Sequence, residues 1–286
     1  MGTDTAGEVA AAPSAPAGRA GRNLPAAIGV GLFLGALILG TLYSPWRWTF
    51  VLVLLAANAL GTHEIVRALR TLGVHPALGV LWVGGTAMLV AAYRGGSTEL
   101  FLGLCLTVLA CVGWRIADPR QGLLRDVTAG VYTAAYVPFL MGFAALLTQP
   151  PDGPRRVTAF IATVVCSDVG GYVAGVLFGK HPMAPSVSPK KSWEGFAGSA
   201  LACAVAGAVF FVTLFHASWL LGVVYGLAVV LSATLGDLGE SMVKRDIGIK
   251  DMGTLLPGHG GLMDRLDSLL PTAPVAWLLL SAFVPR

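Results

Sequence analysis

The sequence predicts an all-α protein, a polytopic membrane bundle of about nine transmembrane helices with its N-terminus in the cytoplasm. Of the 286 residues, 55% are hydrophobic and 12% are charged, and the mean hydropathy is +0.74. A soluble domain carries about 25% charged residues. The apolar residues fall into windows long enough to cross a bilayer, and Lys and Arg gather in alternate loops between these windows.

The chain begins with a segment that is unsuited to a folded core. Residues 1–23 are rich in Ala, Gly and Pro and are predicted to form a disordered tail. Arg19 and Arg22 precede the apolar segment 24–43, which resembles a signal peptide but lacks a convincing small-residue cleavage site. Because the segment is about twenty residues long, we expect it to remain as the first membrane span.

The remaining apolar windows continue this pattern. Lipid offers backbone amides no hydrogen-bond partner, and the windows are too long and too uniformly apolar for barrel strands, so each is expected to be a helix. Spans one to five lie within residues 24–150 and form a charge-poor scaffold, whereas spans six to nine lie within residues 151–286, in the same membrane domain of residues 24–286, and carry the polar loops. The predicted spans are 24–43, 47–66, 76–93, 98–114, 127–148, 157–179, 194–215, 218–237 and 268–284.

The distribution of basic residues predicts the orientation. With nine spans, the tail and the even-numbered loops share one side of the membrane and hold fourteen of the 19 basic residues. Because cytoplasmic loops are enriched in Lys and Arg, that side is expected to be the cytoplasm. Loops 180–193 and 238–267 then both face the compartment that holds nucleoside triphosphates. We expect a multi-pass protein of the inner (plasma) membrane with its active site facing the cytoplasm.

Composition also excludes two kinds of site. The net charge is +4 and the pI is near 9.0, but the basic residues lie between apolar spans and form no continuous face for nucleic acid. The cysteines lie in apolar runs without CxxC spacing, so neither a zinc site nor a disulfide framework is indicated.

The sixth predicted span contains a carboxylate. Asp168 lies in apolar sequence, where a central acid costs about 2.5–3.5 kcal/mol on insertion scales. It shares one helical face with Tyr172, Gly175 and Gly179. Gly171, Gly175 and Gly179 form a small-residue stripe that would let another helix approach closely. Two interpretations stay open: Asp168 bonds a neighbouring helix, or it lines a polar active-site cavity.

A proline-bounded loop, APSVSPKKSWEGFAGS at residues 184–199, leads into the seventh span. Ser192 is the predicted N-cap, and Glu194 lies in the first turn, where the helix dipole favours an acid. Lys190 and Lys191 directly precede the cap, so free helix amides and two ammonium groups would converge on an anion. The alternative is a patch that binds lipid headgroups.

The densest charge lies between residues 237 and 267, where 31 positions hold ten charged residues. If the eighth helix continues beyond residue 237, Asp237, Glu240, Ser241 and Lys244 occupy i, i+3, i+4 and i+7 on one face. Two carboxylates and a hydroxyl are oxygen ligands of the kind that Mg²⁺ prefers. The alternative is a solvated helix end.

The same loop ends in PGHGGLMDRLDS, which places Asp264 and Asp267 at the start of the ninth span. Its glycines and Pro257 allow a sharp turn or a close approach to a phosphate. His259 has three interpretations: a general base, a phosphate donor or a loop residue. Carboxylates from two helices that meet at the membrane surface suit two-metal phosphoryl transfer.

Residues 241–267, SMVKRDIGIKDMGTLLPGHGGLMDRLD, resemble the signature of the phosphatidate cytidylyltransferase family, also called CDP-diacylglycerol synthases. The similarity extends back through Gly236, Asp237, Glu240, the 188–195 stretch and Asp168, and so covers roughly the last 120 residues. The first half is similar to the family only as a set of apolar helices. The matching positions are Ser241, Lys244, Arg245, Lys250, Asp251, Gly253, Leu256, Pro257, His259, Gly260, Gly261, Asp264, Arg265 and Asp267.

The resemblance implies transfer of CMP from CTP to phosphatidic acid in a membrane, giving CDP-diacylglycerol and pyrophosphate, with Mg²⁺ as the cofactor. A second cation and a homodimer are both compatible with the sequence. By analogy with the family's metal site, Asp237 and Asp264 are expected to be the principal ligands, with Glu240 as a further ligand and Ser241 and Asp168 as additional or outer ligands. No covalent nucleophile is required.

The resemblance also assigns the other polar residues. Substrate binding is expected of Ser188, Lys190, Lys191, Ser241, Gly260, Gly261 and Asp168. A catalytic role is expected of Asp237, Asp264, Lys244, Arg245, Lys250, Asp251, His259, Arg265 and Asp267.

Three other classes of membrane protein are alternatives to this family. A CDP-alcohol phosphotransferase would carry a D-G-x-x-A-R run, which does not occur in the sequence. A CTP-using polyprenol kinase is a membrane enzyme with related loop chemistry. A transporter would distribute polar sites across the midplane, whereas these acids gather with basic residues at one membrane face.

Overall fold

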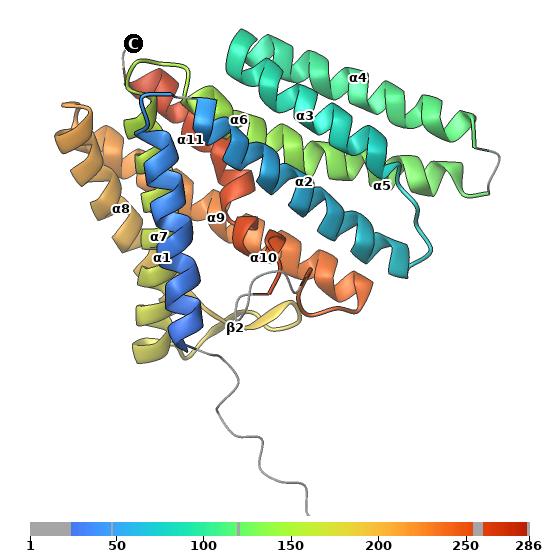
Figure 1. Ribbon diagram of the computed structural model, residues 1–286. Coiled ribbons are helices and arrows are strands. Elements are labelled where there is room, and N and C mark those ends of the chain that lie inside the picture. Colours follow the sequence, from blue (N-terminus) through green and yellow to red (C-terminus); the bar gives the residue numbers. More distant parts are fainter. Residues whose placement is uncertain (1–23, 47, 119–120, 254–259, 285–286) are drawn as a thin grey trace, which may run out of the picture.

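The computed structural model describes residues 24–46, 48–118, 121–253 and 260–284, and most of them are helical (Figure 1). The first half of the chain forms one group of helices, in which a short π-helical segment, η1, joins two α-helices. Its elements are α1 (Leu24–Leu42), α2 (Trp48–Thr71), α3 (Leu78–Gly95), α4 (Ser97–Ile116), α5 (Leu123–Ala134), η1 (Ala135–Phe139) and α6 (Leu140–Leu147).

The second half contains three long helices, one short hairpin and a pair of helices at the end of the chain. Its elements are α7 (Gly153–Phe178), β1 (Pro182–Ala184), β2 (Ser188–Ser192), α8 (Trp193–Leu214), α9 (Trp219–Ile247), α10 (Met263–Leu266) and α11 (Leu269–Phe283).

The predicted membrane fold is confirmed. Within the described ranges, eight helical segments are long and apolar enough to cross a membrane, and they correspond to predicted spans two to nine. α1 lies at the predicted first span, and its part Gly29–Leu42 is apolar. The protein is therefore a polytopic all-α membrane protein.

The structure differs from the prediction in two helix boundaries and in one loop. The fifth span begins at Leu123 and is interrupted by η1, because Pro138 has no backbone N–H to donate within a regular α-helix. α9 continues well past residue 237 to Ile247. The expected loop before the seventh span contains an antiparallel hairpin, in which Pro182 pairs with Ser192 and Ala184 with Ser188.

The hairpin leads directly into α8. Ser192 is the last residue of β2, and its Oγ accepts a hydrogen bond from the Gly195 backbone N–H at 3.1 Å. This is the predicted N-cap, and it is confirmed. Lys190 and Lys191 are thus held at a fixed distance from the first turn of α8.

α7 and α8 cross at glycines, as the small-residue stripe predicts. A Cβ added at Gly170 would lie 2.8 Å from the Gly198 carbonyl oxygen, and one at Gly195 would lie 3.1 Å from the Gly171 oxygen. The backbones therefore touch without side chains between them. This contact fixes Asp168 on α7 relative to the start of α8.

α8 and α9 cross in the same way. A Cβ at Gly222 would lie 2.7 Å from the carbonyl carbon of Gly207, and one at Gly226 would lie 2.5 Å from the carbonyl carbon of Cys203. The three long helices α7, α8 and α9 thus form a close-packed layer that cannot separate without losing contacts along its length.

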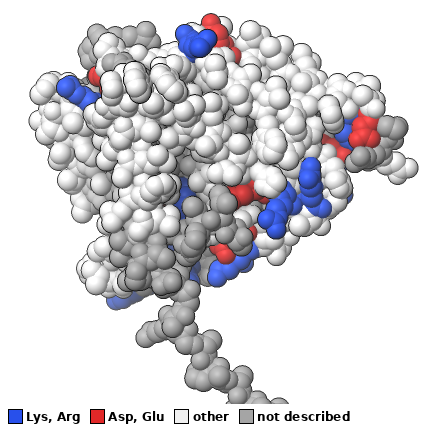
Figure 2. Space-filling view, in the orientation of Figure 1, with Lys and Arg blue, Asp and Glu red and all other residues white. Residues whose placement is uncertain are grey.

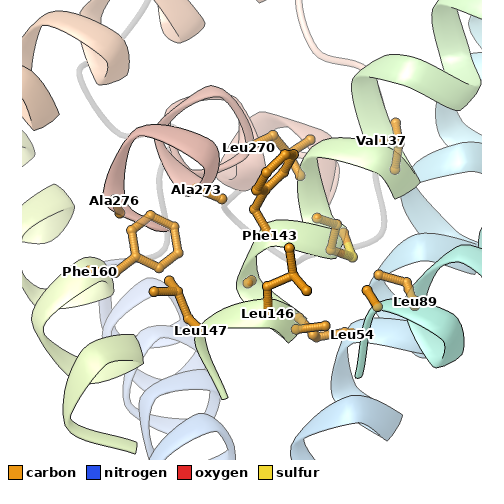
Figure 3. Packing of buried hydrophobic residues seen from close by; sticks show 14 of the residues in the cluster. Leu54, Leu89, Val137, Phe143, Leu146, Leu147, Phe160, Leu270, Ala273 and Ala276 are labelled. Atoms are coloured by element: carbon orange, nitrogen blue, oxygen red, sulfur yellow. The ribbon is translucent and has the colours of Figure 1, made fainter. Parts of the chain in front are cut away.

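The main apolar core lies where α6 and α11 meet α2, α3 and α7. Figure 3 shows Phe143 of α6 pointing toward Leu270 of α11, and Leu147 of α6 toward Phe160 of α7. At the end of α11, the Arg156 guanidinium, 1% exposed, donates to the carbonyl oxygens of Leu280 at 2.7 Å and Val284 at 3.1 Å. These contacts anchor the C-terminal end of α11 to α7.

Replacing Gly207 with Leu should destabilise the protein because the added side chain would overlap the backbone of α9. Overpacking of this kind costs about 1–3 kcal/mol or more. The measurement is the unfolding midpoint in a denaturing-detergent titration. Gly113→Leu on α4 is the matched control, because a Cβ at Gly113 has no neighbour within 4 Å. Equal midpoints for the two variants would contradict the close crossing.

Candidate active site

The polar segments meet at one end of the bundle, where Figure 1 places β2, α10 and the end of α9. Figure 2 shows Lys, Arg, Asp and Glu gathered over this end, while most of the remaining visible surface carries no charge. An ion pair of 2.5 Å between Lys191 Nζ and Asp237 Oδ2 joins β2 to α9. Arg245 Nε also donates to the Val187 carbonyl oxygen at 3.4 Å. The prediction that both polar loops lie on the same side is confirmed.

A pocket of about 320 Å³, the inner pocket, lies between α7, β2, α8 and α9. Its lining includes Asp168, Lys190, Lys191 and Asp237, together with Ser268 at the start of α11. Asp168 is exposed to this space. Of its two interpretations, the structure therefore supports a residue that lines a polar cavity.

A second pocket, the outer pocket, has a volume of about 220 Å³ and lies between the hairpin and the end of α9. Lys190 lines both pockets, so they adjoin. Four basic side chains and two hydroxyls surround the outer pocket, which suits a polyanion such as a triphosphate. The polar lining residues are Ser188, Lys190, Ser241, Lys244, Arg245 and Lys250.

The continuation of α9 places its polar residues on one face, as expected. Ser241 Oγ donates to Asp237 Oδ1 at 3.4 Å, and Lys244 Nζ donates to Glu240 Oε1 at 3.3 Å. Glu240 is 1% exposed, and its Oε2 has no hydrogen-bond partner among the residues that the structure describes. The interpretation of this segment as a solvated helix end is therefore wrong for Glu240.

Asp264 connects α9 to the segment that precedes α10. Its Oδ1 accepts from Lys244 Nζ at 2.8 Å, and its Oδ2 accepts from the backbone N–H groups of Met252 at 3.0 Å and Gly261 at 2.8 Å. Lys244 thus bridges Glu240 on α9 and Asp264 on α10. The two acidic helix ends are brought together, as the sequence predicts.

The acids form one cluster of like charge. Asp168, Asp237 and Asp267 lie close enough for their charges to repel one another, and Glu240 is repelled by Asp264 and Asp267. Lys191 and Lys244 pair with three of these five acids. An excess of negative charge and an unpartnered buried oxygen on Glu240 remain, which is an arrangement that a cation would stabilise.

The donor chemistry fits Mg²⁺. In the described part of the chain, no three His, Cys, Asp or Glu side chains are already grouped around a metal position. Mg²⁺ is usually held by one or two carboxylates together with substrate phosphates, so a preformed cage is not needed. Carboxylates from α7, α9 and α10 supply oxygen donors for this mode of binding.

The loop that carries Asp264 depends on glycine. Gly260 has a φ of +80°, and a Cβ there would lie 3.0 Å from Asp264 Oδ2. A Cβ at Gly261 would lie 2.6 Å from the Gly253 amide nitrogen. A larger residue at Gly260 would therefore displace the Asp264 carboxylate, and one at Gly261 would displace the loop backbone at Gly253.

The structure places the other predicted residues less centrally. Lys250 lines the outer pocket and is exposed, and Asp251 next to it is exposed as well. Arg265 is exposed and lines a separate pocket that Asp264 does not line. Asp267 Oδ1 accepts from the Ser268 backbone N–H at 2.7 Å. His259, predicted to be a general base, a phosphate donor or a loop residue, lies outside the described residues.

Comparison with known proteins identifies the family of this chain. The model of the cytidylyltransferase family matches residues 25–283. The chain belongs to this family. A protein named phosphatidate cytidylyltransferase from Mycobacterium leprae (strain TN) is 48% identical over 287 residues, which cover 92% of this chain and 89% of the relative.

Two further relatives carry the same name. One from Mycobacterium bovis is 44% identical and covers 94% of this chain and 92% of its own length. One from Staphylococcus epidermidis is 33% identical and covers 91% of this chain and 98% of its own length. The expectation that only the last 120 residues resemble the family is corrected, because the family match includes the first half.

The first half of this cytidylyltransferase contributes directly to the site through Glu64, which the sequence analysis missed. Glu64 on α2 is 6% exposed, and its carboxylate accepts the N–H groups of Leu262 at 3.0 Å and Met263 at 2.8 Å. It thus holds the start of α10, next to Asp264. The signal was present, since Glu64 is an acid in an apolar span, as Asp168 is.

Replacing Glu64 with Ala should lower cytidylyltransferase turnover and loosen the start of α10. Hydrogen bonds to a charged group contribute about 1.5–3 kcal/mol each, and two are lost. Hydrogen exchange at the Leu262 and Met263 amides should accelerate, as measured by mass spectrometry in detergent. Glu99→Ala, at an exposed acid in the first turn of α4, is the control and should change neither quantity. Unchanged exchange in the Glu64 variant would remove Glu64 from this role.

Proposed function

We propose that this membrane cytidylyltransferase transfers CMP from CTP to phosphatidic acid and releases CDP-diacylglycerol and pyrophosphate. One observation carries the proposal: a cluster of five acids adjoins a pocket lined by four basic side chains at one end of a membrane bundle. The names of the relatives identify phosphatidate as the acceptor in those proteins.

In this reaction a phosphate oxygen of the lipid attacks the α-phosphorus of CTP. A new P–O bond forms between lipid and CMP, the bond between the α-phosphorus and its bridging oxygen breaks, and pyrophosphate leaves with the electron pair. Two polyanions must approach each other, so positive charge is needed around both. Lys190, Lys244, Arg245 and Lys250 of the outer pocket are suited to the triphosphate.

Asp237 and Asp264 are the proposed principal ligands of Mg²⁺, with Glu240 and Asp168 as further oxygen donors. When bound, Mg²⁺ would supply positive charge beside the phosphate groups and the leaving pyrophosphate. Lys191 and Lys244 pair with the acids of this cluster, and both lie at the pockets where phosphates would bind. They are therefore suited to orient the triphosphate and to neutralise its charge. Gly260 and Gly261 let the loop backbone lie close to Asp264.

We also infer that the polar end of the bundle faces the cytoplasm from the inner membrane. α1 begins at the same end of the molecule as β2 (Figure 1). The start of α1 and the described parts of both polar loops then share the side that is expected to hold most of the basic residues, in keeping with the enrichment of Lys and Arg in cytoplasmic loops.

Pyrophosphate release by the purified protein should require CTP, phosphatidic acid and Mg²⁺ together. Omission of any one, or chelation of Mg²⁺ with EDTA, should abolish release. A CTP-using lipid kinase would instead release CDP, a CDP-alcohol phosphotransferase would release CMP from CDP-diacylglycerol, and a transporter would release neither. Release of CDP rather than pyrophosphate would overturn the proposal.

Asp237→Asn and Asp264→Asn should each lower turnover by about 10²–10³-fold, because each removes a charge that helps to hold the cation at the phosphates. Asp264 also organises the loop, so the Asp237 variant is the sharper test of metal binding. Asp246→Asn, at an exposed acid near the end of α9, is the control and should retain activity. Full activity of Asp237→Asn in a folded protein would remove Asp237 from the metal site.

A further inference from the structure

An apolar groove of about 380 Å³ lies on the other side of α10 from the acid cluster. Its walls come from α1, α2, α6, α7, α10 and α11. Apart from Arg265, every residue that lines it is apolar or glycine. Its volume falls within the range of about 300–1,000 Å³ that is typical of ligand sites.

The groove is open toward the region that lipid occupies. Leu37 on α1 and Val165 on α7 line the groove and are exposed. Leu32 and Phe33, next to the lining residues of α1, are 69% and 65% exposed. In a membrane these side chains face hydrocarbon, so an acyl chain can enter the groove laterally without crossing water.

One short helix separates the groove from the active site. Asp264 of α10 accepts hydrogen bonds from Lys244 and from the Gly261 amide, whereas Arg265 and Leu266 of α10, with Leu262 just before it, line the groove. Arg265 is exposed at the groove and lies close enough to Asp168 of the inner pocket for their charges to interact. A lipid with its chain in the groove would therefore have its headgroup beside a guanidinium at the edge of the active site.

We propose that this groove binds one acyl chain of the lipid substrate and places its phosphate beside Arg265. The inference rests on the proposed function, since phosphatidic acid has the anionic headgroup and the apolar chains that this arrangement would recognise. The occupant is a lipid, because the lining is apolar over its length and carries a single charge at the end nearest the catalytic residues.

Two glycines of α1 leave the space that the acyl chain needs. Gly31 and Gly35 both line the groove, and a Cβ added at either position has no neighbour within 4 Å. They are four residues apart and so lie on the same helical face. From Val30 to Ile38 the lining extends about 12 Å along α1. Larger side chains at Gly31 or Gly35 would fill the groove without disturbing the acids.

The test replaces Gly35 with Leu and compares two phosphatidic acids, one with sixteen-carbon chains and one with six-carbon chains, in mixed micelles. The variant should lower kcat/KM for the long-chain substrate by about tenfold, because roughly two methylene groups lose their burial. kcat/KM for the short-chain substrate and KM for CTP should stay unchanged, because the headgroup site is intact. Gly40→Leu is the matched control, since Gly40 lies on α1, has no neighbour within 4 Å and does not line the groove.

Lipid retention tests the groove independently of turnover. Native mass spectrometry should show that the wild-type protein retains long-chain phosphatidic acid in preference to phosphatidylglycerol, and that Gly35→Leu loses this lipid while Gly40→Leu keeps it. An unchanged ratio of long-chain to short-chain kcat/KM in Gly35→Leu would overturn the proposal. Equal retention of phosphatidic acid and phosphatidylglycerol by the wild-type protein would overturn it too, because the groove would then bind any membrane lipid. Failure of the proposed function would look different: no pyrophosphate would appear with either substrate.

Discussion

The bridge of Lys244 between Glu240 and Asp264 is the interaction on which the site depends. It joins α9 to α10 at the point where acids from separate helices converge. In surroundings of low dielectric, like charges this close repel strongly unless positive charge lies between them. Asp264 uses its second oxygen to hold the loop amides of Met252 and Gly261, so the same carboxylate that receives the lysine also shapes the loop.

The close helix crossings make this convergence possible. Glycines at the α7–α8 and α8–α9 crossings bring the helix backbones into contact, so these helices pack as closely as helices can. α11 is fixed by the apolar core and by Arg156, so its first turn meets α9 at Gly236, where a Cβ would lie 2.8 Å from Pro271 Cγ. A rigid frame of this kind suits phosphoryl transfer, which depends on positioning more than on covalent chemistry.

Under the two proposals, α10 lies between the site for the nucleotide and the groove for the lipid. One side of this short helix carries the acid of the polar cluster, and the other carries apolar residues and Arg265. Glu64 on α2 holds its start, so a helix from the first half of the chain positions the junction between the polar and apolar sites. The scaffold half is thus also part of the active site.

The membrane fold, the approximate spans and the polar cluster could all be predicted from the amino-acid sequence, because hydropathy and i, i+4 spacing are local properties of the chain. The sequence also indicated the Ser192 cap and the glycine stripe of α7. Four features became visible only in the folded protein. Asp168 lines a cavity, and Asp264 is held by Lys244 and two loop amides. Glu64 binds the start of α10, and α1 forms one wall of a groove. These pairings join residues as many as 199 positions apart. Local pattern cannot specify such contacts, because they follow from how whole helices pack against one another.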